Sequence, residues 1–179
     1  IQERLLGGHS DFICRKIREF AENENNIVIN YKSNKTAALE LLNEVRSKGS
    51  QAIAIGADVS DFAQAENLIN SAIEQFGKVD ILVNNAGISD STPIDNYTSE
   101  RFDQVMQLNV NAVMNGVMPT VAVMKEQGGG VILNTSSMVS ICGQPGGVAY
   151  PASKYAVNGL TWSLARELGP FNIRVNAVA

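Results

Sequence analysis

The chain has 179 residues, of which 14 are basic and 18 are acidic, so its formal net charge at pH 7 is −4. Apolar residues make up 45% of it, enough for a sizeable core within one domain. The charge balance excludes the strongly basic surface typical of nucleic-acid-binding proteins. A membrane-spanning helix is also not expected, because the best apolar run, residues 110–124, is interrupted by Asn111, Asn115 and Pro119.

The cysteine and histidine content excludes further classes of protein. Cys14 and Cys142 lie far apart and form neither a CxxC pair nor a disulfide framework, which indicates free thiols in a cytoplasmic protein. The single histidine, His9, is too few for a HExxH zinc site, so we expect no metal. Triad hydrolysis would need the loop around His9 to reach a nucleophile, and it is therefore disfavoured.

Taken in chain order, short β-branched runs alternate with longer amphipathic stretches, which predicts βαβ units around a parallel sheet. The first unit departs from this pattern, because residues 1–6 read IQERLL, with charges where a buried first strand is expected. Further strands are expected at 27–29, 52–55, 81–83, 131–133 and 173–178, each apolar on both faces. Helices are expected at 34–48, 61–76, 99–124 and 153–168.

No linker or internal repeat interrupts this series, so we predict a single α/β domain over residues 1–179. Ile1 is not an initiator Met, and the chain stops within the apolar run 175–179. We therefore expect a domain that is incomplete at both ends.

The strand at 81–83 leads into Asn84-Asn85-Ala86-Gly87. Ligands of open α/β sheets bind at the carboxyl ends of the strands, and small residues there let the backbone approach a ligand closely. An ordinary turn rich in Asn and Gly explains the segment equally well.

Tyr150 and Lys154 stand four residues apart at the start of an expected helix, so they share one helix face. A free phenol has a pKa near 10, and an adjacent ammonium favours its ionised form. Such a tyrosine could donate a proton to a carbonyl oxygen or take one from an alcohol. The same spacing is also common on solvated helix faces.

Two further polar residues stand near expected strand or helix positions. Ser137 follows the strand at 131–133 and could hold a substrate oxygen, although a polar turn is the simpler explanation. Asn109 lies inside an apolar helix, where an amide needs partners. By itself it is best explained as a structural residue that kinks the helix.

Together these features resemble the short-chain dehydrogenase/reductase family, close to its 3-oxoacyl-[acyl-carrier-protein] reductase and glucose dehydrogenase branches. Five motifs stand in the family's order and spacing: NNAG at 84–87, the helix around Asn109, Ser137, YxxxK at 150–154 and IRVNAVA at 173–179. The resemblance implies a Rossmann-like fold, a doubly wound parallel sheet with helices on both faces. It also implies that long helices pair subunits in a homodimer or homotetramer.

The resemblance further implies a catalytic tetrad of Asn109, Ser137, Tyr150 and Lys154, which transfers hydride between a nicotinamide cofactor and a carbonyl or secondary alcohol. Tyr150 would be the general acid or base, and Ser137 would orient the substrate oxygen. Lys154 would bind the nicotinamide ribose and favour the ionised phenol. Asn109 would hold a water that links Lys154 to solvent.

Cofactor contacts are assigned by the same resemblance. Besides Tyr150 and Lys154, they comprise Asp58 and Val59 at the adenine ring, and Asn85, Ala86 and Gly87 on the adenosine side. An Asp before a helix can instead be an N-cap, but Ser60 or Asp61 can fill that role here.

The end of the strand at 27–29 bears on the choice of cofactor. A carboxylate there would bind the ribose 2′-hydroxyl and repel a 2′-phosphate. Tyr31, Lys32 and Ser33 offer no acid and one base. We therefore predict NADP, although relatives with similar residues use either NADP or NAD, and Lys32 could be a solvated turn lysine.

The chain departs from the family at both ends. The family's TGxxxGIG motif aligns with GGHSDFIC at 7–14, where Gly8 remains as a cofactor-binding residue. Phe12 and Cys14 replace the second and third glycines, and Asp11 adds a negative charge near the phosphate site. Relatives also continue beyond residue 179 with a substrate loop and a further strand.

Three functions therefore remain open. The first is an NAD(P)-dependent oxidoreductase acting on a small-molecule carbonyl or alcohol. The second is a non-catalytic relative or fragment that cannot bind the dinucleotide. The third is a scaffold whose long helices pair between subunits.

Overall fold

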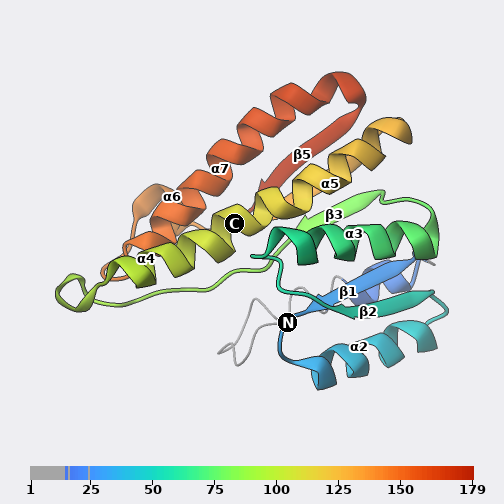
Figure 1. Cartoon of the computed structure of the whole chain (residues 1–179), viewed down its shortest axis with the longest axis horizontal. Helices are drawn as coiled ribbons and strands as arrows, with labels where there is room; N and C mark the ends of the chain where they lie inside the picture. The colour runs from blue at the N-terminus through green and yellow to red at the C-terminus, as the bar shows by residue number, and fades with distance from the viewer. Residues whose placement is uncertain (1–14, 16, 24) are drawn as a thin grey trace. The chain divides into compact units, whose positions relative to one another are not determined.

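The computed structural model describes residues 15, 17–23 and 25–179 (Figure 1). Its contacts divide the chain into two compact units, Ile1–Asp58 and Val59–Ala179. Each unit holds a parallel sheet with helices between successive strands, so the predicted α/β class is confirmed. None of the helices in the described part of the chain combines the length and apolar character needed to cross a membrane.

In the described part of the first unit, two strands and the helix between them form a strand-helix-strand motif. Its elements are β1 (Ile27–Tyr31), α2 (Lys35–Ser47) and β2 (Ala52–Gly56). The strands pair in parallel, with Ile27 opposite Ala52. Asn34 caps α2 by accepting a hydrogen bond from the Ala37 amide at 3.0 Å, because the first amides of a helix have no partner within it. The buried residues of this unit's core are Ala21, Ile29, Ala38, Leu41, Leu42, Val45 and Ala52.

The second unit begins with a helix and contains three strands. Its elements are α3 (Phe62–Phe76), β3 (Ile81–Asn84), η1 (Ile94–Asn96), α4 (Ser99–Met106), η2 (Gln107–Asn111), α5 (Ala112–Glu126), β4 (Gly130–Thr135), α6 (Val139–Cys142), α7 (Ala149–Leu168), η3 (Gly169–Phe171) and β5 (Ile173–Val178). The strands are parallel in the order β3-β4-β5. All five predicted strands are thus present.

Helix α3 shows how local sequence sets the ends of an element. Asp61 accepts a hydrogen bond from the Gln64 amide at 2.9 Å and caps the first turn. Gly77 ends the helix with a φ of 78°, a left-handed conformation that glycine adopts without steric cost. Both ends lie where the sequence predicts them.

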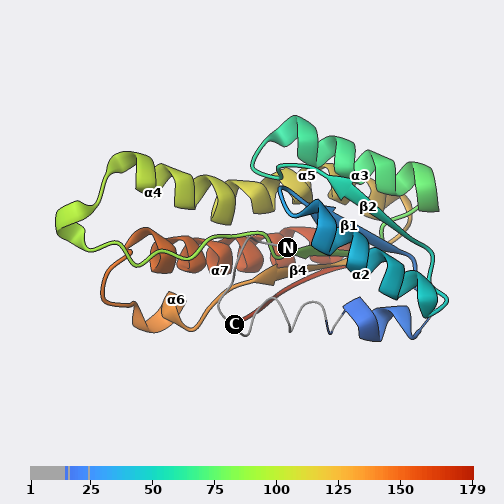
Figure 2. The same ribbon diagram turned by 90° about the horizontal axis from the view of Figure 1, so that it is seen from below.

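The core of the second unit lies between the sheet and the helices α5 and α7 (Figures 1 and 2). Its buried residues are Val113, Val117, Met124, Ile132, Val157, Leu164, Leu168, Ile173 and Val175. Their burial removes apolar surface from water, which stabilises this packing.

The other side of the same sheet is more open. Ile81 and Val83 of β3 keep 44% and 41% of their surface exposed. In β5, Arg174 and Asn176 are exposed while Ile173 between the sheet and α7 is buried. The prediction of two apolar faces is therefore wrong for β5, because its side chains alternate between the core and the exposed face.

The segment predicted as one helix, 99–124, is continuous helical backbone, but its hydrogen-bonding pattern changes from α-helical to π-helical in the middle. Between α4 and α5, the η2 residues Gln107–Asn111 form a π-helical turn centred on Asn109. Such turns are frequent at functional sites.

Helix α7 begins at Ala149, earlier than the predicted residue 153. Pro151 therefore lies in its first turn, where the missing amide proton would have had no helical partner. As a result, Tyr150 belongs to the helix itself, one turn before Lys154.

Candidate active site

The carboxyl ends of β3 and β4 are joined by side-chain amides. Asn84 donates from Nδ2 to Oδ1 of Asn134 at 2.9 Å, and Asn134 donates to the Thr161 hydroxyl of α7 at 3.0 Å. The Thr135 hydroxyl donates to Oδ1 of Asn85 at 3.0 Å. The amides of the NNAG segment thus bond to β4, which brings the residues after β3 next to those after β4.

Lys154 is only 5% exposed and faces the end of β4. Its Nζ donates to the Thr135 carbonyl at 2.6 Å and lies 5.8 Å from the centroid of the Tyr150 ring. Burial lowers the pKa of the Lys154 ammonium to about 8, since a charge removed from water is disfavoured. The predicted proximity of Lys154 and Tyr150 is therefore present in the structure.

Asn109 is 1% exposed and has partners on two neighbouring segments. Its Oδ1 accepts from the Ile88 amide at 2.8 Å, while Nδ2 donates to the Ile88 carbonyl at 3.0 Å and to the Ser153 hydroxyl at 2.9 Å. These bonds explain how an amide is accommodated inside the helix. They also tie η2 to the segment after Gly87 and to α7 beside Lys154.

Gly87 lies against both of these side chains. A Cβ atom added at Gly87 would be 3.0 Å from Asn109 Oδ1 and 3.8 Å from Lys154 Nζ. The backbone after β3 thus passes close to the ammonium. Thr135 is the hydrogen-bond acceptor for one of the three Lys154 protons within the described residues, so the ammonium can supply further donors to the hydroxyls of a nicotinamide ribose.

Ser137 lies two residues beyond the end of β4. It is half-buried, and its Oγ accepts a hydrogen bond from the Val139 amide at 3.4 Å, at the start of α6. Helix α6 packs against α7, which carries Tyr150. Ser137 and Tyr150 are therefore on adjoining elements.

In the first unit, a lysine at the end of β1 forms an ion pair. Lys32 Nζ lies 2.5 Å from Oδ2 of Asp58, which follows β2, and the Tyr31 ring covers Gly56 at the end of that strand. Ser33 is exposed beside them. The sequence of β1 lacks an acid, but the fold brings one from β2, because parallel strands end at the same edge of a sheet.

The remaining predicted cofactor residues are placed as follows. Val59 is in the second unit, where its carbonyl accepts from the Asn115 side chain at 3.0 Å. Ala86 is exposed between Asn85 and Gly87. Gly8, with the altered positions Phe12 and Cys14, lies outside the described residues.

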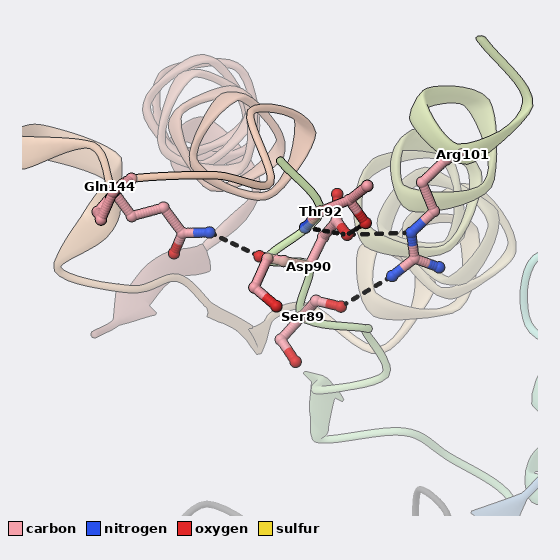
Figure 3. A pocket seen from close by; sticks show the side chains of 7 residues that line it. Ser89, Asp90, Thr92, Arg101 and Gln144 are labelled. Carbon is pink, nitrogen blue, oxygen red and sulfur yellow. Dashed lines mark hydrogen bonds and ion pairs between the residues drawn. The ribbon is translucent and has the colours of Figure 1, made fainter. Parts of the chain in front are cut away.

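A second polar cluster, centred on Asp90, was not predicted from the sequence. It borders a surface pocket of about 530 Å³ (Figure 3), lined by Ser89, Asp90, Ser91, Thr92, Arg101, Gln144 and Pro145. The Asp90 side chain is 1% exposed. Its desolvation raises the pKa, but hydrogen bonds from Tyr97, Thr92 and Arg101 outweigh this effect and lower the pKa of Asp90 to about 2. Only the Asp-x-Thr spacing, typical of a local turn, signals part of this cluster in the sequence.

Comparison with proteins of known sequence finds relatives that are named as dehydrogenases and reductases. A protein named 3alpha-hydroxysteroid dehydrogenase from Mediterraneibacter gnavus is 65% identical over 121 residues, which cover 68% of this chain and 48% of that protein. The chain thus spans about half of that relative's length. The 3-oxoacyl-[acyl-carrier-protein] reductase FabG of Staphylococcus aureus is 38% identical over 176 residues, covering 98% of this chain and 72% of the reductase.

Solved structures show the same fold. Xylitol dehydrogenase with bound NAD+ superposes with a TM-score of 0.88 at 33% identity, over 93% of this chain and 64% of the dehydrogenase. A blue fluorescent protein from a metagenomic library, in complex with NADPH, gives a TM-score of 0.84 at 37% identity, over 90% of this chain and 66% of that one. These likenesses confirm the Rossmann-like fold. The family model described as short chain dehydrogenase matches residues 7–179, and the chain therefore belongs to the short-chain dehydrogenase family.

Proposed function

We propose that this chain is part of an NAD(P)-dependent oxidoreductase that interconverts a secondary alcohol and a ketone. The observation that carries the proposal is the convergence of Tyr150, Lys154, Asn109 and Gly87 beside the carboxyl ends of β3 and β4. Ligands of open α/β sheets bind at such strand ends.

The proposed reaction has two parts: a hydride transfer that involves the cofactor and a proton transfer that involves the protein. The bound nicotinamide supplies or accepts the hydride at the substrate carbon. In the reducing direction, Tyr150 donates its phenolic proton to the carbonyl oxygen, and in the oxidising direction it takes the proton of the alcohol. Ser137 holds the same oxygen by a hydrogen bond.

Lys154 and Asn109 support this proton transfer. The buried ammonium of Lys154 lies 5.8 Å from the centroid of the Tyr150 ring, and its remaining N–H donors are proposed to hold the ribose. Asn109 holds the Ile88 backbone and the Ser153 hydroxyl in place around the ammonium. We also propose that it places a water between Lys154 and solvent.

The substrate class is proposed from the relatives. The relative that is 65% identical is named for 3α-hydroxysteroids, and the S. aureus relative for oxoacyl thioesters. Both names describe a secondary hydroxyl or ketone, which suits a tyrosine acid. We choose a 3α-hydroxysteroid such as androsterone as the first substrate to test.

The cofactor preference remains a prediction. Lys32 favours a 2′-phosphate and therefore NADP, while the Asp58 carboxylate beside it opposes that charge. In the first unit, Tyr31 and Ser33 are proposed as further cofactor contacts at the end of β1. In the second unit, Val59 and Asn85 are proposed as cofactor contacts. Titrating the protein with NADPH and with NADH, by cofactor fluorescence, measures the preference.

A homodimer or homotetramer is proposed as well. Helices α5 and α7 expose large apolar side chains, with Met118 at 48% and Trp162 at 62%. Such residues are enriched at subunit contacts. Sedimentation with and without NADPH tests the assembly, and a monomer under both conditions would contradict it.

Substitution of Tyr150 tests the function. Tyr150→Phe removes the proton donor but little bulk, so turnover of androsterone with NADP+ or NAD+ should fall at least about 100-fold while cofactor affinity stays nearly unchanged. Tyr155→Phe, at an exposed tyrosine of the same helix, should retain full turnover. Retained turnover in Tyr150→Phe would refute the assigned role. Absence of binding at millimolar NADPH and NADH would instead favour the non-catalytic alternative.

A further inference from the structure

Helix α7 carries Tyr150 in its first turn. The residue at its N-cap position, Val148, makes no side-chain hydrogen bond that caps the helix. The first amides of a helix have no partner within the helix. At α7, the Ala149 amide donates to the hydroxyl oxygen of Tyr97 at 3.2 Å. A phenol from a segment 52 residues earlier in the chain therefore caps the helix next to Tyr150.

The Tyr97 hydroxyl is oriented by Asp90. It donates its proton to Oδ2 of Asp90 at 2.5 Å. A hydroxyl has one proton, so a hydroxyl that donates to a carboxylate presents its lone pairs to other donors, here the Ala149 amide. The negative charge of Asp90 also strengthens Tyr97 as an acceptor, because linked hydrogen bonds polarise one another.

Asp90 is itself held from several sides. Its Oδ1 accepts from the Thr92 hydroxyl at 2.8 Å, from the Thr92 amide at 3.3 Å and from Arg101 Nε at 3.1 Å (Figure 3). A buried carboxylate is stable only with such partners, and the loss of one leaves an uncompensated charge. The position of Asp90 is therefore fixed by the second unit's own residues.

The loop that leads into α7 is bound to the same segment. Gln144 Nε2 donates to the Asp90 carbonyl at 2.6 Å, and the Gly147 amide donates to the Thr92 carbonyl at 2.7 Å. A Cβ atom at Gly147 would overlap the Asp90 carbonyl oxygen, so the two backbones are in direct contact. Residues 144–149 thus meet the segment around Asp90 at three successive points.

We infer that Asp90 and Tyr97 are positioning residues that set the first turn of α7 and thereby the place of the Tyr150 phenol. The inference rests on the proposed function of Tyr150. Neither residue belongs to the tetrad, and each acts through the next: Asp90 aligns Tyr97, and Tyr97 caps α7. Because a misplacement of about 1 Å at a reacting group can cost about 100-fold in rate, this cap bears directly on proton transfer.

Tyr97→Phe tests the inference, since it keeps the ring and removes only the hydroxyl. Oxidation of androsterone with NADP+ should show kcat lowered about 10- to 100-fold, while the Kd for NADPH changes less than about twofold. Tyr155→Phe is the matched control on the exposed surface of α7. Asp90→Asn, which keeps the shape but removes the charge, should lower kcat in the same direction, and Asp95→Asn, at an exposed residue of η1, should not.

Two kinetic outcomes would overturn the inference. One is a kcat for Tyr97→Phe within about twofold of the Tyr155→Phe control, and the other is a loss of kcat no larger than the loss of folded protein. A readout independent of activity is hydrogen exchange of the amides at 149–154. Exchange there should be faster in Tyr97→Phe and unchanged across α5. If the unsubstituted protein shows no turnover, the proposed function fails, while unaltered exchange at 149–154 would refute the positioning role separately.

Discussion

The Nζ atom of Lys154 lies 2.6 Å from the carbonyl oxygen of Thr135, so a buried ammonium on α7 is bonded to the last residue of β4. The bond places the charge at the strand end where the candidate site lies. It does not offset the loss of hydration, because the pKa of Lys154 is lowered from 10.5 to about 8.

This lowered pKa makes stability depend on pH in a defined direction. Between about pH 8 and 10.5 the unfolded chain holds the Lys154 proton and the folded chain does not, so stability rises as pH increases through this range. Lys154→Met removes the titrating group. We expect the unfolding free energy of the unsubstituted protein, measured in urea relative to Lys154→Met, to increase from pH 7 to pH 9.5. A difference that is constant over this range would contradict the burial of the charge.

Asp90 differs from Lys154 in that folding favours its charged form, although stability again rises with pH. Its pKa is lowered from 3.8 to about 2, so its ionised form contributes stability that is complete above pH 3.8 and is lost as pH falls through about 2. Asp90→Asn should therefore be less stable than the unsubstituted protein at pH 6, and this gap should narrow at pH 2. Asp95→Asn, at an exposed carboxylate, serves as the control, and the unfolding free energies of all variants are measured in urea at pH 6 and at pH 2. A gap that persists unchanged at pH 2 would show that the charge is not responsible.

Alanine substitutions at Gly147 and Gly143 distinguish the cost of backbone strain from the cost of steric overlap. Both have positive φ, 64° and 68°, but a Cβ at Gly143 would meet nothing within 4 Å, whereas one at Gly147 would strike the Asp90 carbonyl. Gly143→Ala should cost about 1–3 kcal/mol of unfolding free energy for backbone strain alone, because φ 68° with ψ −172° is a conformation that is essentially restricted to glycine. Gly147→Ala should cost about 2 kcal/mol more, because the backbone oxygen cannot move aside. Equal costs in thermal or urea unfolding would contradict the close contact between Gly147 and Asp90.

Gly116 and Gly159 give a similar pair inside helices. A Cβ at Gly116 would lie 2.8 Å from Asn84 Oδ1, and Asn84 cannot turn away without losing its bond to Asn134. Gly116→Ala should therefore destabilise the protein by about 1–3 kcal/mol. Gly159→Ala, which has open space, should stabilise it by about 0.5–1 kcal/mol by favouring helix. The expectation fails if both changes shift the urea midpoint in the same direction.

Local sequence predicted most of the elements of this fold. Asp61 and Gly77 act at the two ends of α3 through hydrogen bonds and dihedral angles that involve only neighbouring residues, so its boundaries could be predicted. The helix predicted at 153–168 begins earlier, at Ala149. Its capping group is Tyr97, from a distant segment, which no local pattern reveals.

In the candidate site, too, local spacing predicted some features, whereas others depend on contacts between distant segments. The spacing of Tyr150 and Lys154 places them on one helix face, since helical neighbours recur every three to four residues. The Asp90 cluster could not be predicted as a whole, because Gln144 lies 54 residues away in the chain, and because Tyr97 and Arg101 reach Asp90 only through the folding of the segment that follows it. Likewise, the Lys32 and Asp58 pair arises only where two parallel strands end together.

The amino-acid sequence alone determined the α/β class, the strands, the helix carrying Tyr150 and Lys154, and the likeness to the short-chain dehydrogenase family. The class, the strands and the helix depend on periodicity or spacing within a short segment, whereas the likeness rests on the order of five motifs between residues 84 and 179. Tertiary structure alone decided which groups surround Lys154, which acid meets Lys32 and how Asp90 reaches α7 through Tyr97. Burial and long-range hydrogen bonding set those relationships, and both depend on residues that are brought together only when the chain is folded.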